Sequence, residues 1–205
     1  MNKRSVVIFD VGRVLIEWDF YHLYRKLLPN DEAIAAFIDE VGLVAANIDF
    51  DRGTVSYAEG IEALATKHPA QADLIRAYDA RWMEAVPGPV QPSVDILWRL
   101  KAAGVPLYAI TNFSAEKWAL SQERFDFLRD GFIDAVVSAH EKLIKPDPAI
   151  YRVCLERNNL NAADCVFIDD SEKNIAAAQA LGIDGILFTP ETDLETELKA
   201  RGLPL

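Results

Sequence analysis

The stretch "SVVIFDVGRVL", residues 5–15, decides the fold that we expect. Four apolar residues, 6–9, run directly into Asp10, and Gly12 follows two positions later. A short apolar run of this kind is typical of a strand that is buried on both faces of a sheet. A carboxylate at the end of such a strand is costly unless it has a partner or chemical work to do. Asp10 is therefore the first candidate functional residue.

From residue 88 onward, apolar strand-like segments alternate with amphipathic helical segments. The strands that we predict after 5–10 are 105–111, 133–139, 165–170 and 184–188. The predicted helices are 91–103, 114–125, 147–158 and 172–181. This alternation favours an α/β fold with a Rossmann-like core, in which a mostly parallel sheet is covered by helices on both faces.

Residues 17–87 interrupt the alternation with several helices in succession and no convincing strand. The predicted helices are 20–28, 31–41, 57–67 and 70–85. Ser56 and Glu59 have the spacing of a capping box, and "DRG" (51–53) before them suits a turn. We predict an α-helical cap domain, 17–87, inserted into a core domain made of 1–16 and 88–205.

Polar side chains follow three of the predicted strands, and a lysine stands in the loop after a fourth. Each of them alone is an ordinary turn or cap residue. Because the carboxyl ends of parallel strands meet at one edge of a sheet, we expect these residues to form one site. They are Asp10, Thr111, Asn112, Lys145, Asp169 and Asp170.

Together these residues suit phosphoryl transfer with Asp10 as nucleophile. A carboxylate that approaches a phosphate is repelled, by about 4 kcal/mol for two unit charges at about 4 Å and an effective dielectric of about 20. Asp10, Asp169 and Asp170 offer the hard oxygen ligands that Mg²⁺ prefers, and Lys145 adds a positive charge. Ser171 and Asn174 open the next helix and are placed to orient the acidic pair.

Four segments resemble, in order, the motifs of the haloacid dehalogenase superfamily. They are "VVIFDVGRVL" (6–15), "AITNFS" (109–114), "KLIKPDPAIY" (142–151) and "VFIDDSEKNIAAAQALGI" (166–183). The helical insertion resembles the cap of the superfamily's most common subgroup. The resemblance implies that Asp10 forms an aspartyl-phosphate and that Thr111, Asn112 and Lys145 bind the phosphate. It also implies that Mg²⁺ is held by Asp10, Asp170 and the backbone oxygen of Gly12, with Asp169 as a supporting or additional ligand.

Gly12 departs from the pattern of most phosphatases in this superfamily, which carry a second aspartate there as general acid and base. A branch similar to bacterial α-D-glucose-1-phosphate phosphatases shares the Asp-x-Gly pattern, and "DVGRV", "WDF" and "DRGTVS" match it locally. General acid catalysis, worth about 10²–10⁴-fold, must then come from elsewhere or be forgone. The candidates to replace the acid or contact the substrate are Arg13, Glu17, Asp19, His22 and Arg52.

Composition narrows the classes of partner. The 205-residue chain carries a net charge of −11, which argues against binding nucleic acid. It has no apolar run near the roughly 20 residues that span a bilayer, so we expect no membrane partner. The first apolar run is too short for a signal peptide, and we therefore expect a cytoplasmic protein. The expected partner is a small phosphorylated metabolite.

These observations predict a Mg²⁺-dependent phosphatase that acts on a small phosphomonoester, most simply a sugar phosphate. Two alternatives stay open. A 2-haloacid dehalogenase resembles this fold and needs no metal, but the adjacent Asp169 and Asp170 would repel each other without a cation. A degenerate protein that binds a phosphorylated ligand without catalysis would explain the glycine at position 12.

Overall fold

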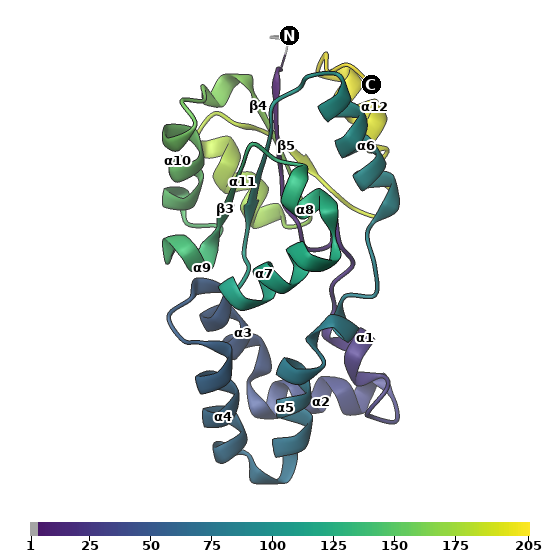
Figure 1. Cartoon of the computed structure of the whole chain (residues 1–205), viewed down its shortest axis with the longest axis vertical. Helices are drawn as coiled ribbons and strands as arrows, with labels where there is room; N and C mark the ends of the chain where they lie inside the picture. Colours follow the sequence, from purple (N-terminus) through teal and green to yellow (C-terminus); the bar gives the residue numbers. More distant parts are fainter. Residues whose placement is uncertain (1–3) are drawn as a thin grey trace.

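The computed structural model describes residues 4–205, and its centre is a five-stranded parallel sheet (Figure 1). The strands are β1 (Val6–Phe9), β2 (Leu107–Thr111), β3 (Asp134–Val137), β4 (Cys165–Asp169) and β5 (Asp184–Leu187). Their order is β3-β2-β1-β4-β5, so Val7 of the central strand pairs with Leu107 on one side and Val166 on the other. The strand order reverses beside β1, where sheets of this kind bind ligands. The predicted α/β core is confirmed.

Helices cover both faces of the sheet because successive strand residues point to opposite faces. Val7 and Phe9 share a core with residues of α6 (Gln91–Ala102) and α12 (Leu194–Ala200). Ile8 lies in a second core with residues of α10 (Pro148–Arg157) and α11 (Glu172–Ala180). The remaining helices of this part are α7 (Ala115–Arg124), α8 (Asp126–Asp130) and α9 (Ser138–Glu141).

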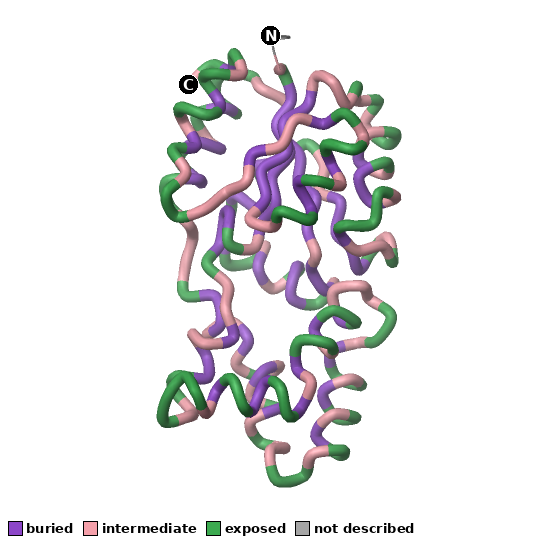
Figure 2. Tube along the Cα trace, turned by 180° about the vertical axis from the view of Figure 1, so that it is seen from behind, coloured by how far each residue is buried: buried purple, intermediate pink, exposed green. Residues whose placement is uncertain are grey.

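A helical segment lies beyond the carboxyl ends of the strands, at the bottom of Figure 1. Its helices are α1 (Phe20–Tyr24), α2 (Asp31–Val41), α3 (Leu43–Arg52), α4 (Tyr57–Lys67) and α5 (Ala72–Ala80). Buried positions line their inner sides in Figure 2, and the rings of Phe50 and Tyr57 pack with centroids 4.4 Å apart. No helix within residues 4–205 is long and apolar enough to cross a membrane. The exact domain boundaries, 1–16 with 88–205 and 17–87, stay a prediction.

The chain enters and leaves this helical segment at one place. Ile16 and Pro89 form an isolated antiparallel bridge. Beside it, the N–H of Glu17 donates to the carbonyl of Gly88 at 2.9 Å, and the N–H of Val90 donates to the carbonyl of Leu15 at 2.9 Å. These hydrogen bonds join the two connections between the sheet-containing part and the helical segment, 15–17 and 88–90, and so help to hold the helical segment opposite the strand ends.

Three parts of the helical segment differ from the sequence prediction. The predicted helix 20–28 is shorter in the structure and ends at Tyr24. Residues 43–52 form α3, although the sequence analysis placed a turn at 51–53; the helix continues through Arg52 and ends at Gly53, which adopts a left-handed φ of 69°. The predicted helix 70–85 is broken into the 3-10 turn Pro69–Gln71, α5 and the 3-10 turn Trp82–Ala85. Half of the expected capping box is present: the Ser56 hydroxyl accepts from the N–H of Glu59, but the Glu59 carboxylate accepts from the Ser56 hydroxyl and not from the Ser56 backbone N–H.

Candidate active site

Three carboxylates meet at the carboxyl edge of the sheet. Asp10 directly follows β1, Asp169 is the last residue of β4, and Asp170 follows it. One oxygen from each lies within 4.8 Å of the others. Hard oxygen donors at this spacing fit a divalent cation such as Mg²⁺, which binds through one or two carboxylates together with phosphate and water.

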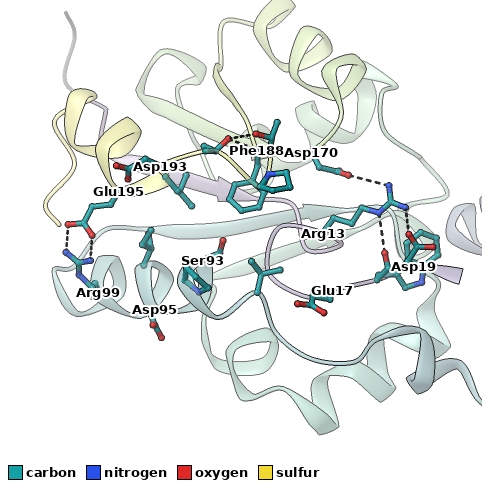
Figure 3. A pocket seen from close by; sticks show the side chains of 18 of the residues that line it. Arg13, Glu17, Asp19, Ser93, Asp95, Arg99, Asp170, Phe188, Asp193 and Glu195 are labelled. Carbon is teal, nitrogen blue, oxygen red and sulfur yellow. Dashed lines mark hydrogen bonds and ion pairs between the residues drawn. The ribbon is translucent and has the colours of Figure 1, made fainter. Parts of the chain in front are cut away.

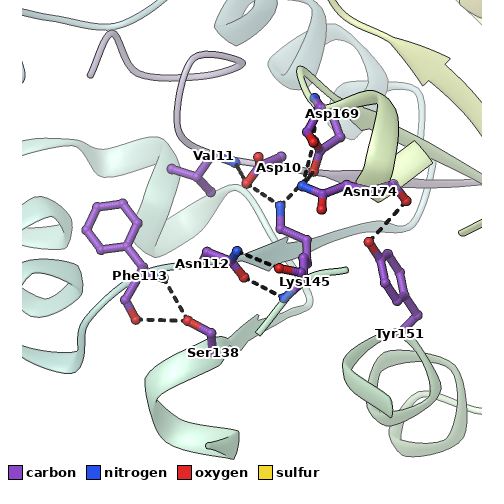
Figure 4. A network of polar contacts seen from close by, with 10 residues as sticks. Asp10, Val11, Asn112, Phe113, Ser138, Lys145, Tyr151, Asp169 and Asn174 are labelled. Atoms are coloured by element: carbon purple, nitrogen blue, oxygen red, sulfur yellow. Dashed lines mark hydrogen bonds and ion pairs between the residues drawn. The ribbon is translucent and has the colours of Figure 1, made fainter. Parts of the chain in front are cut away.

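Lys145 joins two of these carboxylates. Its ammonium Nζ donates to Asp10 Oδ1 at 2.8 Å and to Asp169 Oδ2 at 2.7 Å, and all three side chains are buried (Figure 4). Asn112 fixes the backbone of Lys145 from both sides: its Oδ1 accepts from the Lys145 N–H at 2.8 Å, and its Nδ2 donates to the Lys145 carbonyl at 3.1 Å. In this structure the side chain of Asn112 therefore positions Lys145.

Asp169 is held from the start of α11. Its Oδ1 accepts from the N–H of Ser171 at 2.8 Å and from Nδ2 of Asn174 at 2.9 Å. The backbone carbonyl of Asn174 in turn accepts from the hydroxyl of Tyr151 at 3.1 Å. Lys145 is a further donor, so the carboxylate oxygens of Asp169 are all engaged by hydrogen bonds to protein groups. Asp170, by contrast, is partly exposed to the cavity.

The site has more negative than positive charge. Burial raises the pKa of the Asp10 carboxyl to about 8, the Lys145 ammonium opposes this rise, and Asp169 adds to it. Burial also raises the pKa of Asp170, and the Asp169 charge adds to that. Burial lowers the pKa of Lys145, but the two carboxylates raise it by more. The Lys145 ammonium and the Arg13 guanidinium, 3.8 Å from Asp170 at the rim, do not balance three carboxylates, so the donor set fits an additional cation.

Thr111, the last residue of β2, presents a hydroxyl without a partner. Its Oγ1 is buried and makes no hydrogen bond within residues 4–205. A buried unsatisfied hydroxyl is unfavourable and often marks a missing ligand. Gly12 brings no side chain to the site, and a Cβ built there would have no other heavy atom within 4 Å.

The structure separates other sequence candidates from this cluster. Arg13 lies at the rim, with one guanidinium nitrogen 3.8 Å from Asp170 and another 3.7 Å from Asp19. Glu17 and His22, together with Asp19, line a neighbouring cavity of about 1000 Å³ beside α6 and α12 (Figure 3). Arg52 pairs with Asp49 at 3.3 Å and does not line either cavity. Glu17, His22 and Arg52 do not line the cavity that contains Asp10, whereas Arg13 and Asp170 line both cavities.

A cavity of about 750 Å³ lies between the sheet edge and the helical segment. Asp10, Lys145 and Asp170 line it from the sheet side. The residues that line it from the opposite side were missed by the sequence analysis: Val44, Asn47, Ile48, Asp51, Tyr57 and Trp82. A signal was present, because Asn47 and Asp51 are polar residues four apart, beside the buried Phe50.

A family model for haloacid dehalogenase-like hydrolases matches residues 5–182. The chain belongs to this family. The resemblance seen in the four motifs is thus confirmed for the haloacid dehalogenase-like family as a whole, and the protein is a hydrolase. The finer likeness to α-D-glucose-1-phosphate phosphatases stays a prediction.

Three relatives of this haloacid dehalogenase-like hydrolase have phosphatase names, and two of them match more than half of this chain. Sesquiterpene phosphatase astK of Aspergillus oryzae is 27% identical over 200 residues, which are 95% of each chain. Ribulose-1,5-bisphosphate 5-phosphatase of Halopiger xanaduensis is 29% identical over 138 residues, which are 63% of this chain and 55% of that protein.

Among solved structures, a haloacid dehalogenase family enzyme from Bacteroides thetaiotaomicron, in complex with magnesium and inorganic phosphate, superposes with a TM-score of 0.72. The two chains are 23% identical, and the match covers 95% of this chain and 98% of that one. At this identity the likeness shows the shared haloacid dehalogenase-like fold.

Proposed function

We propose that this hydrolase is a Mg²⁺-dependent phosphatase that cleaves a small phosphomonoester through an aspartyl-phosphate on Asp10. The observation that carries the proposal is the position of the Asp10 carboxylate, 2.8 Å from the Lys145 ammonium and within 4.8 Å of oxygens of Asp169 and Asp170. A carboxylate can attack a phosphate dianion only where positive charge offsets their repulsion. At the sheet edge Lys145 supplies part of this positive charge, and a Mg²⁺ ion held by the carboxylates would supply the rest.

In the proposed reaction an Asp10 oxygen bonds to phosphorus while the ester oxygen departs, and water then releases phosphate from Asp10. Lys145 offsets the negative charge beside Asp10, and the unpartnered Thr111 hydroxyl donates to a phosphoryl oxygen. Mg²⁺, held by Asp10, Asp170 and the Gly12 carbonyl, would supply further positive charge to the phosphoryl oxygens. Asp169 supports the site from behind, since Lys145, Ser171 and Asn174 already donate to it.

The alcohol part of the substrate has two candidate identities. The sequence predicts a sugar, whereas the lining of the cavity suggests a more apolar alcohol. Val44 and Ile48 line the cavity with 51% and 42% of their surface exposed, and Trp18 and Phe113 also line it. The polar Asn47 is already engaged with tyrosine hydroxyls and Asp51. A wall that leaves apolar surface exposed and few polar groups free favours an apolar alcohol. Among the relatives, the name of the sesquiterpene phosphatase agrees with this choice, whereas that of the ribulose-1,5-bisphosphate 5-phosphatase agrees with a sugar phosphate.

The two other activities fit the site less well. A metal-independent dehalogenase has no use for Asp170 beside Asp169, where burial and like charge both raise the pKa of Asp170. A non-catalytic phosphate-binding protein would gain nothing from the Asp10 carboxylate, which repels phosphate.

The test is a panel of alkyl, prenyl and sugar phosphates and of 2-haloacids, each assayed with Mg²⁺ and with EDTA. We expect phosphate release that requires Mg²⁺, fastest with the apolar esters. Halide release in EDTA would overturn the proposal in favour of a dehalogenase. Phosphate release that is fastest with sugar esters would keep the phosphatase and overturn the apolar substrate.

A further inference from the structure

The cavity contains one carboxyl group that the proposed reaction does not use. Asp51 lies in the last turn of α3 and lines the same cavity as Asp10, Gly12 and Lys145. Within residues 4–205, the other carboxylates that line this cavity, Asp10 and Asp170, belong to the sheet edge. Asp51 alone approaches from the helical segment, on the side of the cavity opposite the nucleophile.

The carboxyl of Asp51 is oriented by a chain of hydrogen bonds. Asn47 Nδ2 donates to Asp51 Oδ2 at 2.8 Å. Asn47 Oδ1 in turn accepts from the hydroxyl of Tyr78 at 2.7 Å and from that of Tyr57 at 3.3 Å. Both tyrosines are buried, and Asn47 is nearly so. An oriented side chain supported by packed neighbours is what acid–base chemistry requires.

The end of α3 is fastened to the sheet-containing part of the molecule. The Ser138 hydroxyl donates to the backbone carbonyl of Asp51, and the Lys142 ammonium donates to that of Gly53. Gly53 has a φ of +69°, and a Cβ there would lie 2.6 Å from the Ala139 carbonyl oxygen. Only glycine permits this approach without a shift of backbone. Asp51 is therefore held over the site by contacts within two residues of it.

The environment of Asp51 favours its protonated form. Burial raises the pKa of this carboxyl well above its usual range. The N–H of Ser114, the Asn47 amide and the Lys145 charge lower it, and the charge of Asp10 raises it. A carboxyl that keeps its proton near neutral pH is suited to act as a general acid. The Lys117 ammonium, which lines the same cavity, is paired with Asp79.

We propose that Asp51 is the general acid and base of this enzyme, in place of the aspartate that Gly12 does not provide. The proposal rests on the proposed phosphatase function. Asp51 gives its proton to the ester oxygen as the bond from phosphorus to that oxygen breaks and the Asp10–phosphorus bond forms, so the alcohol leaves neutral. The Asp51 carboxylate then takes a proton from the water that attacks the aspartyl-phosphate. Phosphate is released and Asp51 is protonated again.

The test is Asp51→Asn, with the first turnover measured by rapid quench on an alkyl phosphate and on p-nitrophenyl phosphate at saturating Mg²⁺. The alkyl ester needs a proton on its leaving oxygen, and the aryl ester does not. We expect phosphoryl transfer to fall by about 10²–10⁴-fold with the alkyl ester and by less than about tenfold with the aryl ester. Aspartyl-phosphate should then accumulate with the aryl ester, because its hydrolysis has lost the base.

Two further variants complete the test. The control is Asp49→Asn. Asp49 lies on the same helix but is exposed, so this substitution should change neither rate. Gly12→Asp, added to Asp51→Asn, should restore part of the alkyl rate, since position 12 has space for a side chain. An equal loss on both esters in a folded Asp51→Asn protein would overturn the role of Asp51 and leave the phosphatase intact. A wild-type protein that hydrolyses neither ester would overturn the phosphatase proposal and the role of Asp51 with it.

Discussion

At the sheet edge, the side chains of Asp10 and Lys145 are buried and paired, whereas across the cavity Val44 and Ile48 leave 51% and 42% of their surface exposed. The sheet edge is held by hydrogen bonds to backbone and side chains that surround it. About half of the surface of these two α3 side chains is left uncovered by the residues that the structure describes, 4–205. One wall therefore holds charge at fixed points, whereas the other leaves apolar surface that the proposed substrate would cover.

The largest expected effect comes from removing the nucleophile. Asp10→Asn keeps the shape of the side chain but cannot attack phosphorus, so Mg²⁺-dependent turnover should fall by on the order of 10⁴-fold or more. The far-ultraviolet circular dichroism spectrum should be unchanged. Retention of more than a few per cent of activity in a correctly folded variant would refute the assignment.

The next effect is on stability and compares two buried lysines. Lys145→Ala leaves the buried Asp10 and Asp169 without their cation and should reduce the free energy of unfolding in EDTA by about 3–5 kcal/mol. Lys117→Ala is the matched control, because its partner Asp79 is partly exposed, and should cost less than about 2 kcal/mol. Urea denaturation measures both. Equal losses would mean that the sheet-edge cluster is no more dependent on its cation than the Lys117 pair.

A smaller effect is expected when one of the proposed metal ligands is removed. Asp170→Ala should raise the Mg²⁺ concentration needed for half-maximal activity by about 10–100-fold, and high Mg²⁺ should restore part of the rate. Glu172→Ala, an exposed carboxylate two residues on, is the control and should behave as wild type. Metal dependence that does not change in Asp170→Ala would remove Asp170 from the proposed ligands.

The smallest effect is expected from a substitution in the apolar wall of the cavity that α3 forms. Ile48→Ala should raise KM for an apolar phosphomonoester by about tenfold, with kcat little changed, because it removes contact area without touching the reacting atoms. A sugar phosphate should be affected less. Ile133→Ala, which is 65% exposed and outside the cavity, is the control. If the two variants behave alike, Ile48 does not contact the substrate.

The strands and the residues that follow them could be predicted from the sequence. Asp10, Thr111 and Asp169 stand at the ends of apolar runs, and parallel strands bring their carboxyl ends to one edge. Asp51 could not be found in the same way. Its neighbours Arg52 and Gly53 suggested a turn, and the four-residue spacing of Asn47 and Asp51, although compatible with a helix, does not show that this helix reaches the sheet edge.

The sequence by itself determined the α/β core, the helical insertion and the charged residues at the sheet edge, because apolar periodicity and strand ends are patterns within a few residues. Only the tertiary structure decided that Asp51 faces Asp10 and that Glu17 and His22 do not. That arrangement depends on contacts between distant segments, such as the hydrogen bond from Ser138 to the Asp51 carbonyl, 87 residues away in the chain. The packing of α3 against α9, which leaves room only for a glycine at position 53, is the physical reason.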